Sequence, residues 1–279
     1  MSVLTFKKLI GLIADNPLNN NTTKIKFVRH KENHKDYQEI VKDILGNSDH
    51  LENYQRHQDK PVFSGCDYIV SFIGLEGSKA LFWNVFKILD YRQLEDGTYQ
   101  YDMDRLNIFD ELAYRIVIDW GKGTLAWHQH YATTDKEVLE IYPKGYLGKF
   151  PGYDAVYLTY SELLLLVNNP DANRDWKSAL SAVNGIYLIV DKNKQDEKQY
   201  IGSAYGSQGI WGRWCEYASN GHGDNVNLKI LCEQENYQKQ FTFAILKTLP
   251  KNLSDREVIA FENLYKKKLG SRVYGLNAN

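Results

Sequence analysis

Residues 184–203 read NGIYLIVDKNKQDEKQYIGS, and this stretch decides the fold of the C-terminal part of the chain. Two apolar, β-branched and aromatic runs, 185–190 and 199–203, stand on either side of a very polar segment. Such runs predict two strands, and the polar segment between them predicts the loop of a hairpin. Because strand side chains alternate, Ile186, Leu188 and Val190 are expected to face a core, while Tyr187 lines a cleft.

The elements around this hairpin predict a small α/β domain. A short helix is expected at 176–182, further helices at 209–219 and 255–269, and a third strand at 241–246. The last helix begins with a capping box, Ser254-x-x-Glu257, and ends at Gly270. The order predicts a three-stranded antiparallel sheet flanked by helices.

Residue types that suit phosphate chemistry follow the hairpin. Arg213 and, four residues later, Tyr217 share one face of the helix 209–219, and an arginine fork matches phosphate bidentately. Glu262 lies inside the apolar face of the last helix. A carboxylate there costs several kcal/mol if unpaired, so it needs a partner, which is either a divalent cation or a buried arginine. A single carboxylate suits Mg²⁺, which keeps most of its waters.

The tripeptides Gly185-Ile186-Tyr187 and Tyr200-Ile201-Gly202, followed by Arg213, Glu262 and Gly275-Leu276-Asn277, resemble the GIY-YIG endonuclease family. The resemblance covers roughly the last third of the chain and keeps the family's order and approximate spacing. It implies an enzyme that hydrolyses phosphodiester bonds in double-stranded DNA with Mg²⁺ or Mn²⁺. The residues that it implies as catalytic are Tyr187, Tyr200, Arg213, Tyr217 and Glu262, with Glu262 as the metal ligand. Those that it implies as supporting are His222, Asn277, Gly185 and Gly202.

The implied mechanism assigns a role to each of these groups. Tyr187 is the expected base for the attacking water and His222 the alternative, while Arg213 stabilises the phosphate oxygens. A tyrosine with a pKa near ~10 costs roughly 4 kcal/mol to ionise at pH 7, so the site must be electropositive. Gly202 is expected to let a backbone or a phosphate come close, and Asn277 to orient the site.

The first 168 residues predict a separate, β-rich domain, so the fold class is α+β. We expect domains at 1–168 and 176–279, joined by the polar, Pro-containing linker 169–175. The N-terminal domain is predicted to be a small curved sheet or barrel with flanking helices. Its predicted elements are helices at 3–14 and 37–45, a loop at 49–60, strands at 24–28, 68–73, 80–89, 112–120, 124–131 and 138–142, a hairpin over 113–127, and a closing helix capped by Thr159 and Glu162.

The aromatic residues of the N-terminal domain suggest a role in recognition. Residues 77–88 resemble a strand of PUA-like barrels, some of which read modified bases. This resemblance implies that Trp83 and Trp120 contact a flipped base, with core packing as the alternative. Arg213 and Lys229 are further candidate contacts to DNA.

The amino-acid composition limits the classes to which the protein can belong. The formal net charge is −1, but residues 176–279 have 14 basic and 10 acidic residues, and the remainder is acidic. A basic C-terminal part is compatible with phosphate contacts, and ordinary scatter of surface charge explains it equally well. The three cysteines predict neither a disulfide framework nor a zinc site. No signal peptide or membrane-spanning run is recognisable, so we expect a soluble, cytoplasmic protein.

Three functions remain after these observations. The first is a restriction or defence endonuclease, including one that depends on base modification. The second is a DNA repair or mobile-element nuclease, although neither helix-hairpin-helix repeats nor an elongated basic region is visible. The third, of a different class, is a catalytically inactive DNA-binding module, against which the retained Tyr187, Arg213 and Glu262 count. One active site per chain leaves open a homodimer on DNA or sequential nicking.

Overall fold

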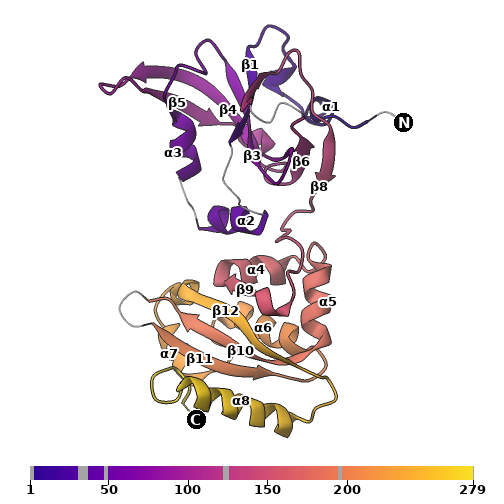
Figure 1. Ribbon diagram of the computed structural model, residues 1–279, viewed down its shortest axis with the longest axis vertical. Coiled ribbons are helices and arrows are strands. Elements are labelled where there is room, and N and C mark those ends of the chain that lie inside the picture. Colours follow the sequence, from indigo (N-terminus) through magenta and orange to yellow (C-terminus); the bar gives the residue numbers. More distant parts are fainter. Residues whose placement is uncertain (1–2, 31–36, 47–49, 122–125, 194–196, 279) are drawn as a thin grey trace. The chain divides into compact units, whose positions relative to one another are not determined.

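The computed structural model describes residues 3–30, 37–46, 50–121, 126–193 and 197–278. The chain forms two compact units, Met1–Lys144 and Gly145–Asn279, and each unit has its own sheet (Figure 1). Among the described residues no helix combines the length and the hydropathy needed to cross a membrane.

Unit 1 is a curled, half-barrel sheet with short helices. Its strands follow the order β2-β5-β4-β3-β1-β7, and β6 joins β4 to β8. The long strand β4 pairs with β3 along one edge, while β6 and β5 share its other edge. The elements are α1 Phe6–Ile10, η1 Pro17–Asn19, β1 Ile25–His30, α2 Tyr37–Leu45, α3 His50–Arg56, β2 His57–Gln58, β3 Tyr68–Gly74, β4 Lys79–Gln93, β5 Tyr99–Arg105, η2 Asn107–Phe109, β6 Ile116–Asp119, β7 His128–His130 and β8 Val138–Ile141.

Two predictions for unit 1 were wrong. The expected hairpin over 113–127 does not form between β6 and β7, because β6 pairs with β4 and β8, and β7 pairs with β1. The adjacent side chains of Ile116 and Val117 are fully buried in different hydrophobic clusters, so both faces of β6 are covered. The predicted Gly-Lys-Gly turn of the hairpin falls partly on residues 122–125, outside the described residues.

The segment expected to be a loop at 49–60 instead contains the helix α3. A tertiary contact explains this helix: Gln55 is buried and accepts a hydrogen bond of 2.5 Å from the Ser71 hydroxyl on β3. Strand β5, which we did not expect, alternates buried Tyr101 and Met103 with polar residues.

Unit 2 is an antiparallel sheet in the order β11-β10-β12-β9. The predicted hairpin and third strand form as β10, β11 and β12, and both predicted capping boxes are present, at Thr159 and Ser254. The elements are η3 Tyr153–Ala155, β9 Tyr157–Thr159, α4 Tyr160–Asn168, α5 Arg174–Ala182, β10 Asn184–Asp191, β11 Lys198–Ala204, α6 Gly209–Asn220, α7 Val226–Leu231, η4 Tyr237–Gln240, β12 Phe241–Leu249 and α8 Asp255–Leu269.

The fourth strand, β9, belongs to unit 2, so the boundary between the units lies earlier in the chain than we expected. It pairs with β12, and the helix that follows it, α4, packs against α6, so both belong to unit 2. The division therefore lies after Lys144 rather than in the polar stretch 169–175, which we expected to be the linker. A three-residue strand is too short to be assigned to one sheet or the other from its own sequence.

Both faces of the second sheet are covered. Ile186 and Ile201 pack with Val258 of α8 on one face. On the other face, Tyr187 contacts Trp214 and Tyr217 of α6 edge-to-face. Strand β11 is the end strand of this sheet, and α6 and α8 contact it from opposite faces.

Candidate active site

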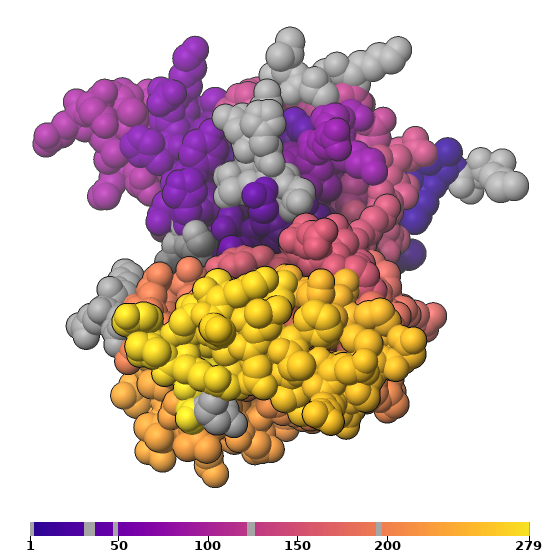
Figure 2. All heavy atoms as spheres, turned by 60° about the horizontal axis from the view of Figure 1, so that its bottom comes forward, coloured from indigo at the N-terminus to yellow at the C-terminus, as the bar shows by residue number. Residues whose placement is uncertain are grey.

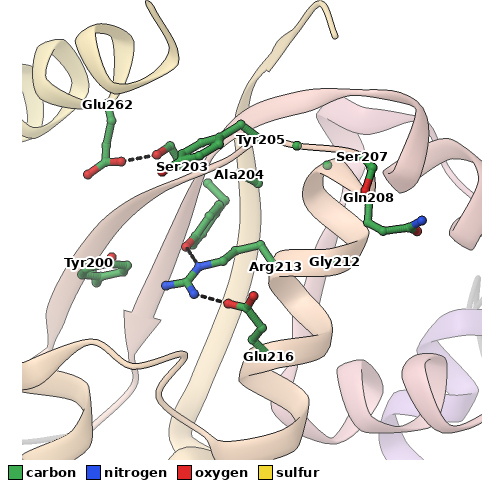
Figure 3. Close-up of a pocket in the computed structure, with 13 residues that line it drawn as sticks. Tyr200, Ser203, Ala204, Tyr205, Ser207, Gln208, Gly212, Arg213, Glu216 and Glu262 are labelled. Atoms are coloured by element: carbon green, nitrogen blue, oxygen red, sulfur yellow. Dashed lines mark hydrogen bonds and ion pairs between the residues drawn. The ribbon is translucent and has the colours of Figure 1, made fainter. Parts of the chain in front are cut away.

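A cavity of about 640 Å³ lies at the end of β11 and the beginning of α6. Figure 3 shows Arg213 reaching it from α6 and Glu262 from α8, on opposite sides of β11. Tyr187, Tyr200, Ser203 and Glu216 are also among its lining residues. Residues far apart in the sequence therefore meet at one edge of the sheet.

Arg213 is fixed against the cavity wall by several oxygens. Its Nε donates to the Tyr187 hydroxyl at 3.2 Å, and one terminal nitrogen donates to the Gly223 carbonyl at 2.7 Å. The other terminal nitrogen pairs with the carboxylate of Glu216. Burial lowers the pKa of Arg213, but the oxygens of Tyr187, Tyr217 and Glu216 raise it by more, so the guanidinium stays charged.

Tyr187 is fully buried, although it borders the cavity. Its hydroxyl lies 3.0 Å from the hydroxyl of Tyr217, which is buried as well. Burial raises the pKa of both tyrosines above the ordinary value, and for Tyr187 it outweighs the opposing effect of Arg213. We expected cationic neighbours to favour the phenolate, so this geometry counts against Tyr187 as the base.

Gly202 makes room for a side chain and not for a phosphate. A Cβ at this position would lie 2.3 Å from the Tyr187 hydroxyl oxygen, because Gly202 is the direct partner of Tyr187 across the hairpin. Gly185 is similarly crowded, since a Cβ there would lie 2.8 Å from Ile210 of α6. Gly185 therefore allows α6 to pack closely on the hairpin, and Gly202 leaves room for the ring of Tyr187.

Glu262 points from α8 toward β11 and is partly buried, with 15% of its side chain exposed. It accepts a hydrogen bond from the Ser203 hydroxyl and forms an ion pair of 2.6 Å with Lys266, one turn later on α8. We expected this carboxylate to have either a divalent metal ion or a buried arginine as its partner. The partner in the structure is Lys266. Lys266 itself is buried, so the pair is largely screened from water.

A divalent cation fits this arrangement. Glu262 lines the cavity, and a single carboxylate is enough for Mg²⁺ when water and substrate phosphate supply the remaining ligands. Among the described residues no cluster of three or more His, Cys, Asp or Glu side chains could hold a metal ion by itself. Any ion at Glu262 would therefore depend on the substrate for part of its coordination.

The residues that we expected to support the site make contacts through backbone groups. Asn277 is buried and pairs with both backbone groups of Ile201, at 2.9 and 2.8 Å. The C-terminal end is thereby joined to β11 between Tyr200 and Gly202. His222 does not line the cavity, and its Nδ1 accepts a hydrogen bond from the Asp224 amide at 3.0 Å. The segment containing His222 contributes through the Gly223 carbonyl, which holds Arg213.

The candidate DNA contacts outside the cavity fall into two groups. Lys229 is exposed on α7. Trp83 and Trp120 are buried, with 2% and 1% exposed, and they pack in the two hydrophobic clusters of unit 1. This burial agrees with core packing, the alternative that we considered for these two residues, and leaves neither ring exposed to a flipped base. Both residues lie in or next to strongly apolar strands, whose side chains pack into the core.

Sequence reasoning missed three residues of the site. Glu216 is three residues after Arg213, and Lys266 is four residues after Glu262, so helical spacing could have identified both as partners. Ser203 had no such signal, because its contact with Glu262 depends on how α8 packs against β11.

Comparison with known proteins gives few matches. No family model matches the sequence, and no curated protein does. Among solved structures, the chain is similar to the catalytic domain of the homing endonuclease I-TevI, with 28% identity and a TM-score of 0.27 over 34% of this chain and 98% of that one. A mutant of the same catalytic domain, that of the intron endonuclease I-TevI, gives 28% identity and a TM-score of 0.26, over 35% of this chain and 94% of that one.

Proposed function

We propose that this protein is a metal-dependent DNA endonuclease of the GIY-YIG type that hydrolyses phosphodiester bonds. The observation that carries the proposal is the meeting of Arg213, Glu262 and Tyr200 around one cavity at the edge of β11. An oriented guanidinium and a partly buried carboxylate that line the same cavity suit a phosphodiester and a cation.

In the proposed reaction, Arg213 binds the non-bridging oxygens of the cleaved phosphate and stabilises their growing charge. The Tyr187 hydroxyl and the Gly223 carbonyl keep the guanidinium in one orientation, so it needs no rearrangement. A divalent ion held by Glu262 would supply Lewis acidity at the leaving oxygen. The Ser203 hydroxyl orients the Glu262 carboxylate toward that position.

Activation of the water is assigned in this proposal to Tyr200 in its ionised form, which takes a proton from the water as the water oxygen bonds to phosphorus. The bond from phosphorus to the leaving oxygen breaks in the same step, and that oxygen takes up a proton from solvent. Tyr200 lines the cavity and keeps 8% of its surface exposed, whereas Tyr187 has none. A water at the cavity can reach the Tyr200 hydroxyl without displacing the buried pair of Tyr187 and Tyr217. Tyr187 is then a positioning residue that acts through Arg213.

The biological setting that we propose is restriction or defence. Unit 1 would supply selectivity, since it has its own sheet and cores. Cleavage of unmodified DNA compared with cytosine-modified DNA, using the full chain, would test whether base modification directs it. Equal cleavage of both would contradict modification dependence.

The central test is Glu262→Gln. We expect this variant to lose Mg²⁺-dependent cleavage of plasmid DNA and to keep DNA binding, because the amide cannot replace the carboxylate as a cation ligand. Glu233→Gln is the matched control, since Glu233 is exposed in the same unit and does not line the cavity. Undiminished cleavage by Glu262→Gln would exclude the proposed mechanism, and absence of any cleavage by the unmodified protein would favour a binding module.

A further inference from the structure

A second cavity, of about 500 Å³, lies where α8 ends and the chain turns back. We call it the α8 groove, and it is lined by Leu264, Lys266, Lys267, Gly270, Arg272 and Val273. Figure 2 shows α8 and the residues after it, in yellow, spread across one exposed face. The groove lies wholly within unit 2 and is separate from the candidate active site.

The charged side chains that line the α8 groove are all cationic. From Asn263 to the end of the chain there are four cationic residues and no aspartate or glutamate. Three of the four, Lys266, Lys267 and Arg272, line the groove, and no carboxylate does. A concave surface lined by cations alone attracts polyanions, and phosphate chains above all.

The position of the groove links it to the candidate active site. Glu262 lines the first cavity, Lys266 lines the second, and the two side chains form an ion pair of 2.6 Å. One turn of α-helix advances only ~5.4 Å. A DNA strand advances ~3.4 Å per nucleotide, so a strand cleaved beside Glu262 would reach the groove within about two nucleotides.

The other walls of the groove suit sugars. Leu264 and Val273 leave 43% and 75% of their surfaces exposed, and these apolar surfaces can pack on deoxyribose. Arg272 donates to the Asn263 side chain at 2.6 Å, which joins the two sides of the groove. Gly270, with a φ of 65°, allows the sharp turn after α8.

We propose that the α8 groove binds the sugar–phosphate backbone of the substrate DNA next to the cleaved bond. This inference rests on the proposed function, since it assigns the path of the same substrate. Lys267 and Arg272 contact phosphates directly. Lys266 remains paired with Glu262, so the net positive charge of the groove comes from Lys267 and Arg272.

Lys268 provides a matched control for this proposal. It follows Lys267 on α8 and is exposed, but it lies over the Tyr265 ring at 5.4 Å and does not line the groove. Lys267→Gln and Lys268→Gln thus remove the same charge from neighbouring positions. Thermal unfolding of each variant checks that the fold is retained.

The experiment measures DNA binding at several salt concentrations by the full-length protein with Glu262 intact, without divalent cations so that no cleavage occurs. Each phosphate contact contributes about 0.9 to the slope of log affinity against log salt. We expect Lys267→Gln to lower this slope by about one, Lys267→Gln with Arg272→Gln by about two, and Lys268→Gln by much less. Equal slopes for Lys267→Gln and Lys268→Gln, or unchanged slopes throughout, would overturn the proposal.

Failure of the groove and failure of the nuclease give different results. If the unmodified protein cuts DNA and the double variant binds and cuts equally well, the groove proposal fails alone. If the unmodified protein never cuts, but the double variant loses binding as described, the groove stands and the proposed catalytic function fails.

Discussion

Cationic side chains that are held by several contacts differ in their partners between the two units. In unit 1, one terminal nitrogen of Arg29 donates to three backbone carbonyls, those of Leu75, Gly77 and Lys79, at 3.2 to 3.4 Å. Lys136 donates to the Trp120 carbonyl at 2.6 Å and lies over the ring of the same residue. In unit 2, Arg213 and Lys266 instead pair with the carboxylates of Glu216 and Glu262.

Under the proposed function, this difference separates Arg213, whose carboxylate partner a phosphate can replace, from cations that support the fold. Backbone carbonyls are fixed by the fold and cannot swing away as a side chain can, so Arg29 and Lys136 keep these partners. A carboxylate such as that of Glu216, with 54% of its side chain exposed, can swing into water and leave its place to a phosphate. The presence of a cavity beside Arg213 makes this exchange geometrically feasible.

The largest effect is expected from Arg213→Lys. Lysine keeps the charge but loses the planar fork, so it cannot bind Tyr187, Gly223 and a phosphate together. We expect the rate of DNA cleavage to fall by about 10²–10³-fold, as when one oriented donor is removed from an active site. Single-turnover cleavage with excess protein measures this.

Arg29→Lys is the control for that variant in unit 1. It should reduce the midpoint of thermal unfolding and leave the cleavage rate of the folded protein nearly unchanged. A loss of cleavage in Arg29→Lys as large as in Arg213→Lys would remove the distinction between the two classes of cation.

A smaller effect on cleavage is expected from Asn277→Ala. This variant tests whether the role of a residue follows from the kind of group that it binds or from the unit in which it lies. Asn277 lies in unit 2 but binds only backbone, so we expect it to behave as a structural residue. Leaving two buried backbone groups of Ile201 without partners should cost about 3 kcal/mol of unfolding free energy. Denaturant unfolding measures this cost. If cleavage by the folded variant fell as far as in Arg213→Lys, Asn277 would have a direct part in the reaction.

The smallest effect concerns Lys136, whose pKa burial lowers to about 8. An unfolded lysine titrates near ~10.4, so between these values the unfolded chain binds more protons and stability rises with pH. From roughly pH 8 to 9.5 the unfolding free energy should increase by about 2 kcal/mol. Lys136→Met should remove this increase, and the difference between the two proteins, measured by denaturant unfolding, cancels the contributions of other groups. The same pH dependence in Lys136→Met would show that another group is responsible.

Local patterns predicted most of unit 2 and less of unit 1. The hairpin of β10 and β11 and the helix α8 follow from short-range signals, namely alternation around a polar loop and a capping box with a closing glycine. Strand β6 in unit 1 pairs with strands distant in sequence, and the glycine turn next to it suggested the wrong partner. A single sequence contains no local pattern that shows which distant strands pair with each other.

The candidate site shows the same division between local and distant information. Helical spacing links Arg213 to Tyr217 and, in principle, to Glu216, because residues three or four apart share a face. The burial of Tyr187, the contact of Ser203 with Glu262 and the pairing of Asn277 with Ile201 join segments that are distant in sequence. These contacts changed the expected base from Tyr187 to Tyr200.

The sequence by itself determined which residue types follow one another and on which faces of their helices and strands they lie. It placed Tyr187 on the opposite face of its strand from Ile186, and Glu262 within an apolar helix face. Only the tertiary structure decided which of these groups meet, because β11 is an end strand and α6 and α8 contact it from opposite faces. A side chain's solvent exposure, and with it its pKa and its chemistry, depends on that packing and not on its own segment.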